Sequence, residues 1–323
     1  MDIQKPHSEE TLGSAFVVLA ALAFSTAGIF TKVVEADAWS VIFWRGIAAI
    51  AFVILYLGLK GSLREEARAF RWPALIVTLC LASGTAAFIS AFKLTSIANV
   101  SVIWATAPFW AACLAFMSMR ENPGARVLIC SAFALLGVVI TIRGSWDICL
   151  WRGDGLALAM TLMMATAMVI YRAYPDTPTK LPAAVSAALL LPFALALSSP
   201  FTTDPHEIGL LALFGLVFAA GTVLLMEGAR RISSAKAALF SALETPLAPL
   251  WALLILAEWP ALATIIGGTI VMGAVVHAQW PGSLARRAAK PHLNAHMLRD
   301  IGQDGAAERS LEDLEFRRLR DRL

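Results

Sequence analysis

Long apolar runs separated by short polar segments organise this sequence from residue 12 to residue 280. A helix needs about 20 apolar residues to cross the hydrocarbon core of a bilayer, and ten runs reach this length within a few residues. They cover 12–33, 39–59, 72–92, 96–118, 124–142, 155–173, 181–199, 207–229, 236–257 and 260–280. The pattern therefore predicts an all-α integral membrane protein with ten transmembrane helices.

The composition supports a membrane protein. Hydrophobic residues make up 59% of the chain and charged residues only 15%, whereas soluble domains carry about 25% charged residues. The net charge of +3 comes from basic residues scattered through the loops rather than gathered on one face, so nucleic-acid binding is not indicated. The lipid bilayer is the expected environment.

The distribution of Lys and Arg predicts the orientation. If the N-terminus lies in the cytoplasm, most basic residues near the ends of the runs fall on the cytoplasmic side. An even number of spans then returns the C-terminus to the same side. We expect a multi-pass protein of the bacterial inner membrane with both termini cytoplasmic, as a monomer or a homodimer. The charged tail contains an amphipathic helical pattern at 311–323, which suits a solvated tail or a partner-binding element.

The sequence repeats itself at a constant offset. Gly84 matches Gly221 and Pro123 matches Pro260 at one spacing, and Gly13 matches Gly153 at a similar one. Five helices in each half make the two halves antiparallel, which is a signature of secondary transporters. The predicted organisation is a cytoplasmic N-terminus at 1–11, a first repeat at 12–142, an extracytoplasmic connecting loop at 143–154, a second repeat at 155–280 and a charged cytoplasmic tail at 281–323.

The second half carries a recognisable pattern. The segment at 227–249 contains Ala-Arg-Arg followed by small residues and Leu-Glu-Thr-Pro, and Ala-Glu-Trp-Pro and a Gly-rich last span follow at 257–275. This pattern resembles the EamA family of the drug/metabolite transporter superfamily, and the first half shows a weaker copy. Two departures stand out: Ala107 replaces the equivalent of Glu244, and Ala257 stands where the family has glycine.

The resemblance implies two inverted five-helix repeats around a central cavity and the export of amino acids, with the aromatic amino-acid exporters as one possibility. The favoured function is a secondary transporter that exports amino acids or related small metabolites by alternating access. The alternatives are an exporter of drugs or other metabolites, such as cationic or nucleoside-like compounds, or a membrane-embedded enzyme. The membrane enzyme would need a polar catalytic cluster at one leaflet, which the sequence lacks.

Glu244 is the strongest candidate for substrate binding because it is a carboxylate within an apolar run, where an ionised group is costly. It either binds a substrate amine or a coupling proton, or it bonds to backbone groups freed by nearby prolines. Trp104 lies one turn before Pro108, so a continuous helix would place both on one face. Its repeat equivalent, Ser241, lies one turn before Glu244. An aromatic wall suits flat or cationic substrates.

Other candidates are weaker. Further residues that we expect to line the cavity are Phe24, Ser25, Phe88, Asn99, Met164 and Phe240. Helix breaks or gates are expected at Pro108, Pro246, Pro249 and Glu227, the last of which has the spacing for an ion pair with Arg230 or Arg231. Arg45 is expected to reach the membrane interface beside Trp44 rather than to bind substrate. No phosphate-binding loop, metal-ligand spacing or nucleophile–base pair occurs, so neither a cofactor nor a metal is predicted.

Overall fold

The computed structural model describes residues 7–120, 124–143, 148–229, 231, 240–241 and 243–279. The predictions for the tail at 281–323 and for Arg230 fall outside these residues. The same holds for most of the start of the ninth apolar run, at 232–239 and at Ala242.

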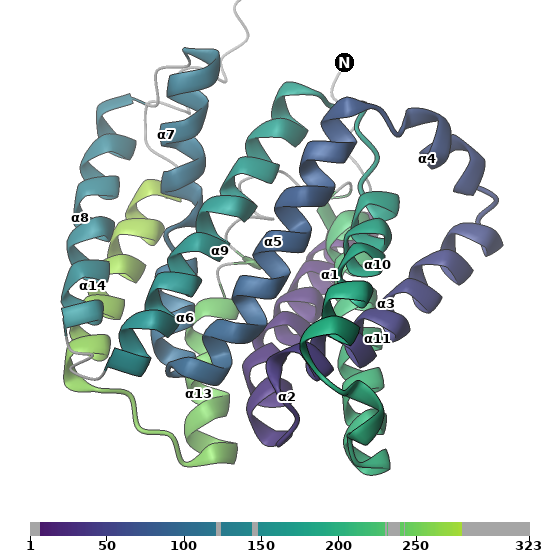
Figure 1. The fold of residues 1–323 in the computed structure, drawn as a ribbon. Coiled ribbons are helices and arrows are strands. Elements are labelled where there is room, and N and C mark those ends of the chain that lie inside the picture. The colour runs from purple at the N-terminus through teal and green to yellow at the C-terminus, as the bar shows by residue number, and fades with distance from the viewer. Residues whose placement is uncertain are drawn as a thin grey trace, which may run out of the picture. The chain divides into compact units, whose positions relative to one another are not determined.

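Every regular element in the described part of the chain is a helix (Figure 1). The first half contains α1 (His7–Ser25), α2 (Ala27–Val33), α3 (Ala38–Leu59), α4 (Leu63–Ala69), α5 (Trp72–Leu94), α6 (Ile97–Trp104), α7 (Ala107–Met119) and α8 (Gly124–Arg143). The second half contains α9 (Ile148–Ala173), α10 (Lys180–Leu197), the short 3-10 helix η1 (Pro200–Thr202), α11 (Pro205–Ala229), α13 (Glu244–Leu256) and α14 (Leu262–Gln279).

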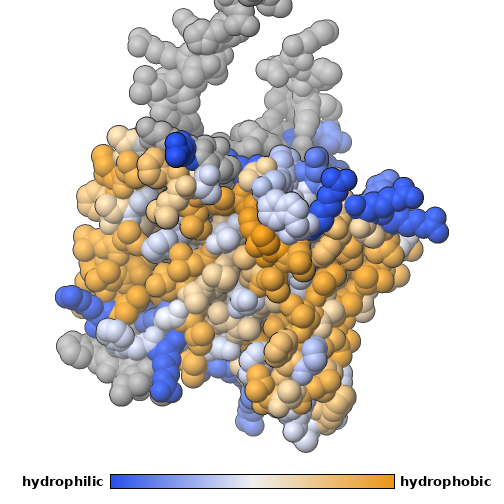
Figure 2. Space-filling model, turned by 45° about the horizontal axis from the view of Figure 1, so that its top comes forward, coloured by the Kyte–Doolittle hydropathy of each residue, from blue (hydrophilic) through white to orange (hydrophobic). Residues whose placement is uncertain are grey.

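The helices have the length and surface of membrane spans. Among the described residues, eight helical stretches are long and apolar enough to cross a bilayer, and α13 and α14 add two shorter apolar helices. Figure 2 shows apolar side chains in a broad band, with hydrophilic residues towards its two ends. Large apolar side chains such as Leu59, Leu254 and Leu262 are exposed on the protein and fit a lipid environment. The predicted ten-helix membrane protein is confirmed.

Two spans are broken in the middle. The first span consists of α1 and α2, with the break at Thr26, and the fourth consists of α6 and α7, with the break at Ala105 and Thr106. At both breaks a threonine hydroxyl donates to the carbonyl three residues earlier, from Thr26 to Ala23 at 2.7 Å and from Thr106 to Ile103 at 2.6 Å. Such bonds compete with the regular helical pattern and explain where the helices stop. The break in the first span was not predicted.

The repeat predicted from the sequence extends to the helix ends. α7 and α13 both have 13 residues, and they begin and end at positions related by the offset that relates Gly84 to Gly221. Each helix is followed by a residue in the left-handed conformation, Arg120 with φ 53° and Ala257 with φ 51°. These are the only non-glycine residues with positive φ in the described ranges.

The contacts between helices also repeat between the two halves. α5 packs on α9, and the equivalent pair α11 and α1 packs in the same way. A Cβ atom added to Gly84 would lie 2.8 Å from the end of the Met164 side chain, and one added to Gly221 would lie 3.1 Å from the Phe24 ring. Phe24 and Met164 are themselves equivalent positions, so both glycines admit the same close helix approach. The pairs α3 with α10, α6 with α13 and α8 with α14 each join equivalent spans of the two halves.

The halves run in opposite directions. The Lys93 amine near the end of α5 donates to the carbonyl of Val34, just after α2, at 2.6 Å. Thr95, after α5, donates to Asp154 near the start of α9. The end of the first span and the start of the sixth therefore lie on one side of the molecule. We call this side, which carries the 34–37 and 198–207 loops, the vestibule face, and the opposite side, which carries Glu9 and Arg231, the terminal face.

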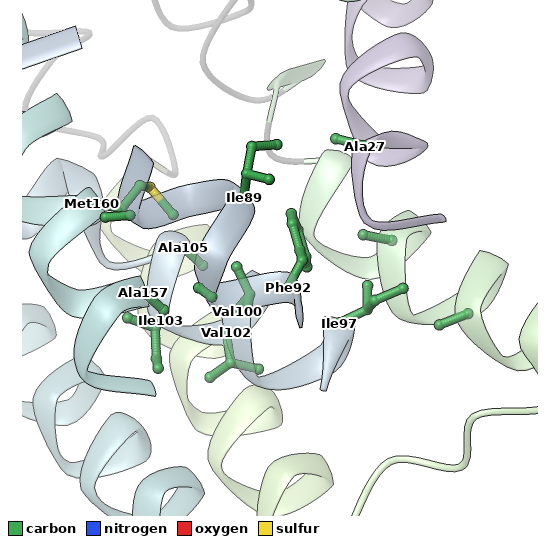
Figure 3. Packing of buried hydrophobic residues seen from close by; sticks show 14 of the residues in the cluster. Ala27, Ile89, Phe92, Ile97, Val100, Val102, Ile103, Ala105, Ala157 and Met160 are labelled. Carbon is green, nitrogen blue, oxygen red and sulfur yellow. The ribbon is translucent and has the colours of Figure 1, made fainter. Parts of the chain in front are cut away.

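The buried core lies between the halves. Figure 3 shows side chains from α5, α6 and α9 packing together, including Ile89, Val100 and Met160. The same cluster includes Ala27 of α2 and residues of α11, α13 and α14. α6, the first half of the broken fourth span, therefore lies at the centre of the molecule, with the start of α7 beside it.

Candidate functional site

Glu244 lies where α13 begins, beside the turn at Leu243. The side chain of Trp104 at the end of α6 forms a hydrogen bond with its carboxyl group, with the indole N–H as donor. α6 and α13 are in contact along this region. A helix N-terminus carries partial positive charge and favours a carboxylate. The structure thus brings the two main predicted site residues together at the centre of the molecule.

The prolines do not all act as the sequence suggested. Trp104 and Pro108 were expected on one face of a continuous helix, but the break at Ala105 and Thr106 separates them, and Pro108 is an exposed residue in the first turn of α7. Proline is favoured in a first turn because that position needs no N–H donor. Pro246 lies in the first turn of α13 in the same way. Pro249 lies inside α13 and does not end it.

A second contact ties α13 to the first span. The Trp251 indole donates to the Ser25 hydroxyl at 3.0 Å, and Ser25 in turn donates to the carbonyl of Leu22 at 2.8 Å. Trp251 follows Glu244 by two helical turns and so shares its face of α13. Ser25 is buried, and its only hydroxyl proton is already used. In the structure Ser25 thus links Trp251 to the first span, and its predicted contact with substrate stays a prediction.

Phe24 belongs to an aromatic cluster that joins the first span to α11. The cluster consists of Phe24, Phe30, Phe214 and Phe218. The rings of Phe24 and Phe218 are 5.0 Å apart between centroids, and those of Phe30 and Phe214 are 5.3 Å apart and stacked. Rings at these separations attract each other beyond their apolar burial.

Arg45 extends into this cluster. Its guanidinium carbon lies 4.7 Å from the centre of the Phe214 ring and 4.3 Å from that of Phe218. The residue is only 8% exposed. The expectation that Arg45 reaches the membrane interface is therefore wrong. The aromatic rings of α11 hold the cation in the interior through cation–π attraction.

The remaining residues predicted to bind substrate or to act as a gate do not form one cluster. Phe88 packs edge to face on Phe92 at 4.7 Å beside the core, and Met164 packs against Gly84. Phe240 and Ser241 are helical and half-buried. Glu227 forms the predicted ion pair with Arg231 at 2.9 Å, near the end of α11 on the terminal face. None of these contacts tests a role in substrate binding.

Asn99 is part of a buried polar network. Its amide nitrogen donates to both carboxylate oxygens of Asp154, at 3.1 and 3.2 Å, and its amide oxygen accepts from Thr264 at 2.6 Å. Thr95 donates to the same carboxylate at 2.7 Å. These bonds engage both ends of the Asn99 amide, and its predicted contact with substrate stays a prediction. The network joins the third, fourth, sixth and tenth spans.

The vestibule face carries a pocket of about 580 Å³. Its lining comes from the loops before α3 and α11 and contains Glu35, Ala36, Asp37, Ser40, Thr202, Thr203, Asp204 and Glu207. Burial alone would raise the pKa of Asp37, but hydrogen bonds from the Ser40 hydroxyl and from the backbone N–H groups of Trp39 and Ser40 lower it below its usual value. The Asp37 carboxylate therefore stays ionised and gives the pocket negative charge.

Sequence reasoning missed several of these residues. Trp251 could have been found, because it follows Glu244 at helical spacing on the same face. Arg45 is a charged residue within an apolar run, which indicates a functional residue, but the sequence does not show which side of α3 faces α11. Asp154 lies close to the end of its run and was taken as part of a loop. Within the described residues, no group of three or more His, Cys, Asp or Glu side chains could hold a metal ion.

The model of the EamA-like transporter family matches this chain twice, over residues 11–143 and 151–278. Among 22 matching chains of solved structures, one titled "Crystal structure of protein" is similar with a TM-score of 0.56 and 18% sequence identity. That alignment covers 86% of this chain and 99% of the other, and it supports the fold alone. No curated protein matched.

Proposed function

Because the chain belongs to the EamA-like transporter family, whose members are membrane transporters of small molecules, we propose that it is a secondary transporter that exports amino acids or related metabolites. The observation that carries the proposal is the contact between Glu244 and Trp104. It lies where the central helices of the two inverted repeats are interrupted. Sites of secondary transporters lie at such interfaces between repeats, near discontinuous helices.

The chemistry of this contact suits an amine beside an apolar or aromatic group. An ionised Glu244 would attract a substrate ammonium group, while the Trp104 ring offers a flat apolar wall and a π face. When no substrate is present, the Trp104 N–H satisfies the carboxylate. Phe24, Phe88, Met164, Phe240 and Ser241 are proposed to line the path around this contact.

Alternating access is supported by matching contacts on the two faces. On the vestibule face, Glu207 at the start of α11 accepts a hydrogen bond from the N–H of Ala36 at 3.2 Å. On the terminal face, Glu66 of α4, the short helix that precedes α5, accepts from the N–H of Leu181 at 2.9 Å. Glu207 lies at the start of α11 and Glu66 precedes α5, and these two helices are equivalent in the repeat. Their partners are Ala36, just before α3, and Leu181, at the start of α10, and these two helices are also equivalent. Equivalent closures on opposite faces are what an inverted-repeat transporter needs to open one face at a time.

The orientation follows from the charge pattern. We place both termini in the cytoplasm of a bacterial cell, with the vestibule face outside the inner membrane. The acidic pocket would then be the last space that a substrate crosses during export. The carboxylates of this pocket also favour a second candidate function, the export of organic cations, because like charges would repel anions from this exit.

Flux measurements with the purified protein in liposomes test the proposal. The panel contains labelled aromatic and aliphatic amino acids, organic cations and a nucleoside. We expect flux of at least one amino acid, and a loss of about tenfold or more in Glu244→Gln, since a hydrogen bond to a charged group contributes about 1.5–3 kcal/mol. Glu65→Gln, an exposed carboxylate of α4, is the matched control. Flux of organic cations alone would favour the second candidate, and no flux for any compound would refute both.

A further inference from the structure

Arg45 is a buried cation without a hydrogen-bonding partner in the part of the chain that the structure describes. Its Nε atom is buried and makes no hydrogen bond, and none of the ion pairs found there involves the residue. A guanidinium group has five N–H donors and stays charged in proteins. Leaving such a group unpaired within a membrane protein is costly.

The aromatic rings account for only part of this cost. Phe214 and Phe218 attract the charge through their π faces, at 4.7 and 4.3 Å. A cation–π contact of this kind contributes about 0.5–2 kcal/mol. It offers no lone pair, so the N–H donors remain available for an acceptor. The rings therefore position the guanidinium without neutralising it.

The interior carboxylates of the described residues have other partners. Glu244 is bound by Trp104, and Asp154 is bound by Thr95 and Asn99. At the vestibule face, Asp37 accepts from Ser40. The segments outside the described residues within 7–279 contain only Glu121 and Asp147 as carboxylates, and both belong to polar separators between apolar runs. Within the part of the chain that the structure describes, Arg45 thus has no counter-ion.

Arg45 also lies where the two repeats meet. It belongs to α3 of the first half, and the rings that hold it belong to α11 of the second. Phe218 continues to Phe24, whose neighbour Ser25 binds Trp251, and Trp251 shares a helix face with Glu244. A series of side-chain contacts therefore leads from Arg45 to the candidate carboxylate of the site.

We propose that Arg45 binds the carboxylate of the transported substrate through a bidentate pair. Arginine presents two parallel N–H groups that match a carboxylate. A single cation suits a singly charged group, and Glu244 together with the acidic vestibule would disfavour a doubly charged phosphate. The inference rests on the proposed function in placing the substrate between the repeats.

Transport of matched compounds tests this role. The probes are a labelled amino acid, its methyl ester, a carboxylic acid of similar size without an amine, and a phosphate monoester. We expect Arg45→Gln to raise the KM for the amino acid and the acid about 10- to 100-fold, because a charge-assisted hydrogen-bonded pair is lost. The ester should be carried as in the unaltered protein. Arg45→Lys should be intermediate, since lysine keeps the charge but not the bidentate geometry.

Controls separate binding from folding. Arg152→Gln removes an exposed arginine and should leave every KM unchanged. Melting temperatures of all variants are compared, and Arg45→Lys decides the matter if Arg45→Gln does not fold. An equal loss for acid and ester, or wild-type KM for the acid in both Arg45 variants, would overturn the proposal. So would a preference of the unaltered protein for the phosphate monoester over the acid.

The same panel distinguishes this inference from the proposed function. If the unaltered protein carries the acid but no amino acid, and Arg45→Gln loses it, Arg45 keeps its role while the amino-acid function fails. If the protein carries only the ester and other cations, the carboxylate role fails although the protein is still a transporter.

Discussion

The close packing of α8 against α14 gives a quantitative test of the fold. An added Cβ at Gly267 would overlap the Thr141 hydroxyl and the carbonyl oxygen of Gly137, and one at Gly137 would lie 2.6 Å from the carbonyl oxygen of Gly267. Two backbones approach each other here with no room for a methyl group, as in other membrane helix pairs with small residues at the contact. Gly273 on the same helix has open space around it.

The expected size of the effect follows from two opposing contributions. Overpacking costs about 1–3 kcal/mol, while replacing a helical glycine by alanine contributes up to about 1 kcal/mol in favour of the helix. We therefore expect Gly267→Ala to lower the free energy of unfolding by about 1–2 kcal/mol. Gly273→Ala, which meets no obstacle, should leave it unchanged or raise it by up to about 1 kcal/mol.

Reversible unfolding of the purified protein in mixed detergent micelles measures both variants. The double variant Thr141→Ala with Gly267→Ala should recover only part of the loss, because the Gly137 carbonyl belongs to the backbone and stays in place. A double-mutant cycle isolates that part. If Gly267→Ala is as stable as Gly273→Ala, the helices do not approach each other as described, and the reasoning fails.

Two further predictions concern polar contacts. Asp154→Asn turns an acceptor of three hydrogen bonds into a group with its own donors, so we expect it to lower the free energy of unfolding by about 1–3 kcal/mol in the same assay. Thr264→Val removes the hydrogen bond to Asn99 and should lower it by about 1 kcal/mol. A change below about 0.5 kcal/mol in both variants would contradict the network. Because the pKa of Asp37 is lowered in the folded protein, its ionised form stabilises the fold above the unfolded pKa of about 3.9, and this contribution is lost as pH falls through the folded pKa. The stability difference between the unaltered protein and Asp37→Asn should therefore be constant near neutral pH and shrink only below about pH 3.9, and a difference that shrinks between pH 5 and 7 would contradict the assignment.

The sequence predicted the arrangement of the spans well because the bilayer constrains them strongly. Each crossing needs a long apolar run, so the runs alone located the spans in the part of the chain that the structure describes, most of their ends to within a few residues. The exception is α9, which begins at Ile148, inside the predicted connecting loop at 143–154. The repeat of Gly84 with Gly221 also held, because the two glycines lie at equivalent helix crossings in the two halves. Regular features of this kind can be predicted from the sequence.

The interior contacts were harder to predict because they depend on rotation about each helix axis. Hydrophobicity is nearly uniform around a membrane helix, so it does not show which side of α3 carries Arg45 towards α11. The breaks were harder for a similar reason. Thr26 and Thr106 end their helices through bonds to carbonyls three residues back, and such bonds are compatible with many positions of threonine in a span. Proline marked the break in the fourth span only approximately.

Two equivalent helix pairs, α5 with α9 and α11 with α1, meet at opposite faces with unequal chemistry, and this inequality bears on the proposed transport cycle. At the vestibule face, α9 meets the end of α5 at Gly153 and Thr95, and the buried Asp154 carboxylate accepts three hydrogen bonds there. At the terminal face, α1 meets the end of α11 at Gly13 and Gly228.

In the described part of this second contact, Arg231 forms an ion pair with Glu9 of α1, and the two side chains are 28% and 49% exposed. The ion pair of Arg231 with Glu227 lies within the end of α11 and does not join the two helices. Exposed ion pairs contribute about 0–1 kcal/mol, whereas hydrogen bonds to a buried charge contribute about 1.5–3 kcal/mol each. Separation of α1 from α11 therefore breaks the exposed Arg231–Glu9 ion pair, whereas separation of α9 from α5 breaks the stronger hydrogen bond from Thr95 to the buried Asp154 carboxylate. Without substrate, an alternating-access cycle built on these pairs would favour opening at the terminal face, which for an exporter is the side where the substrate enters.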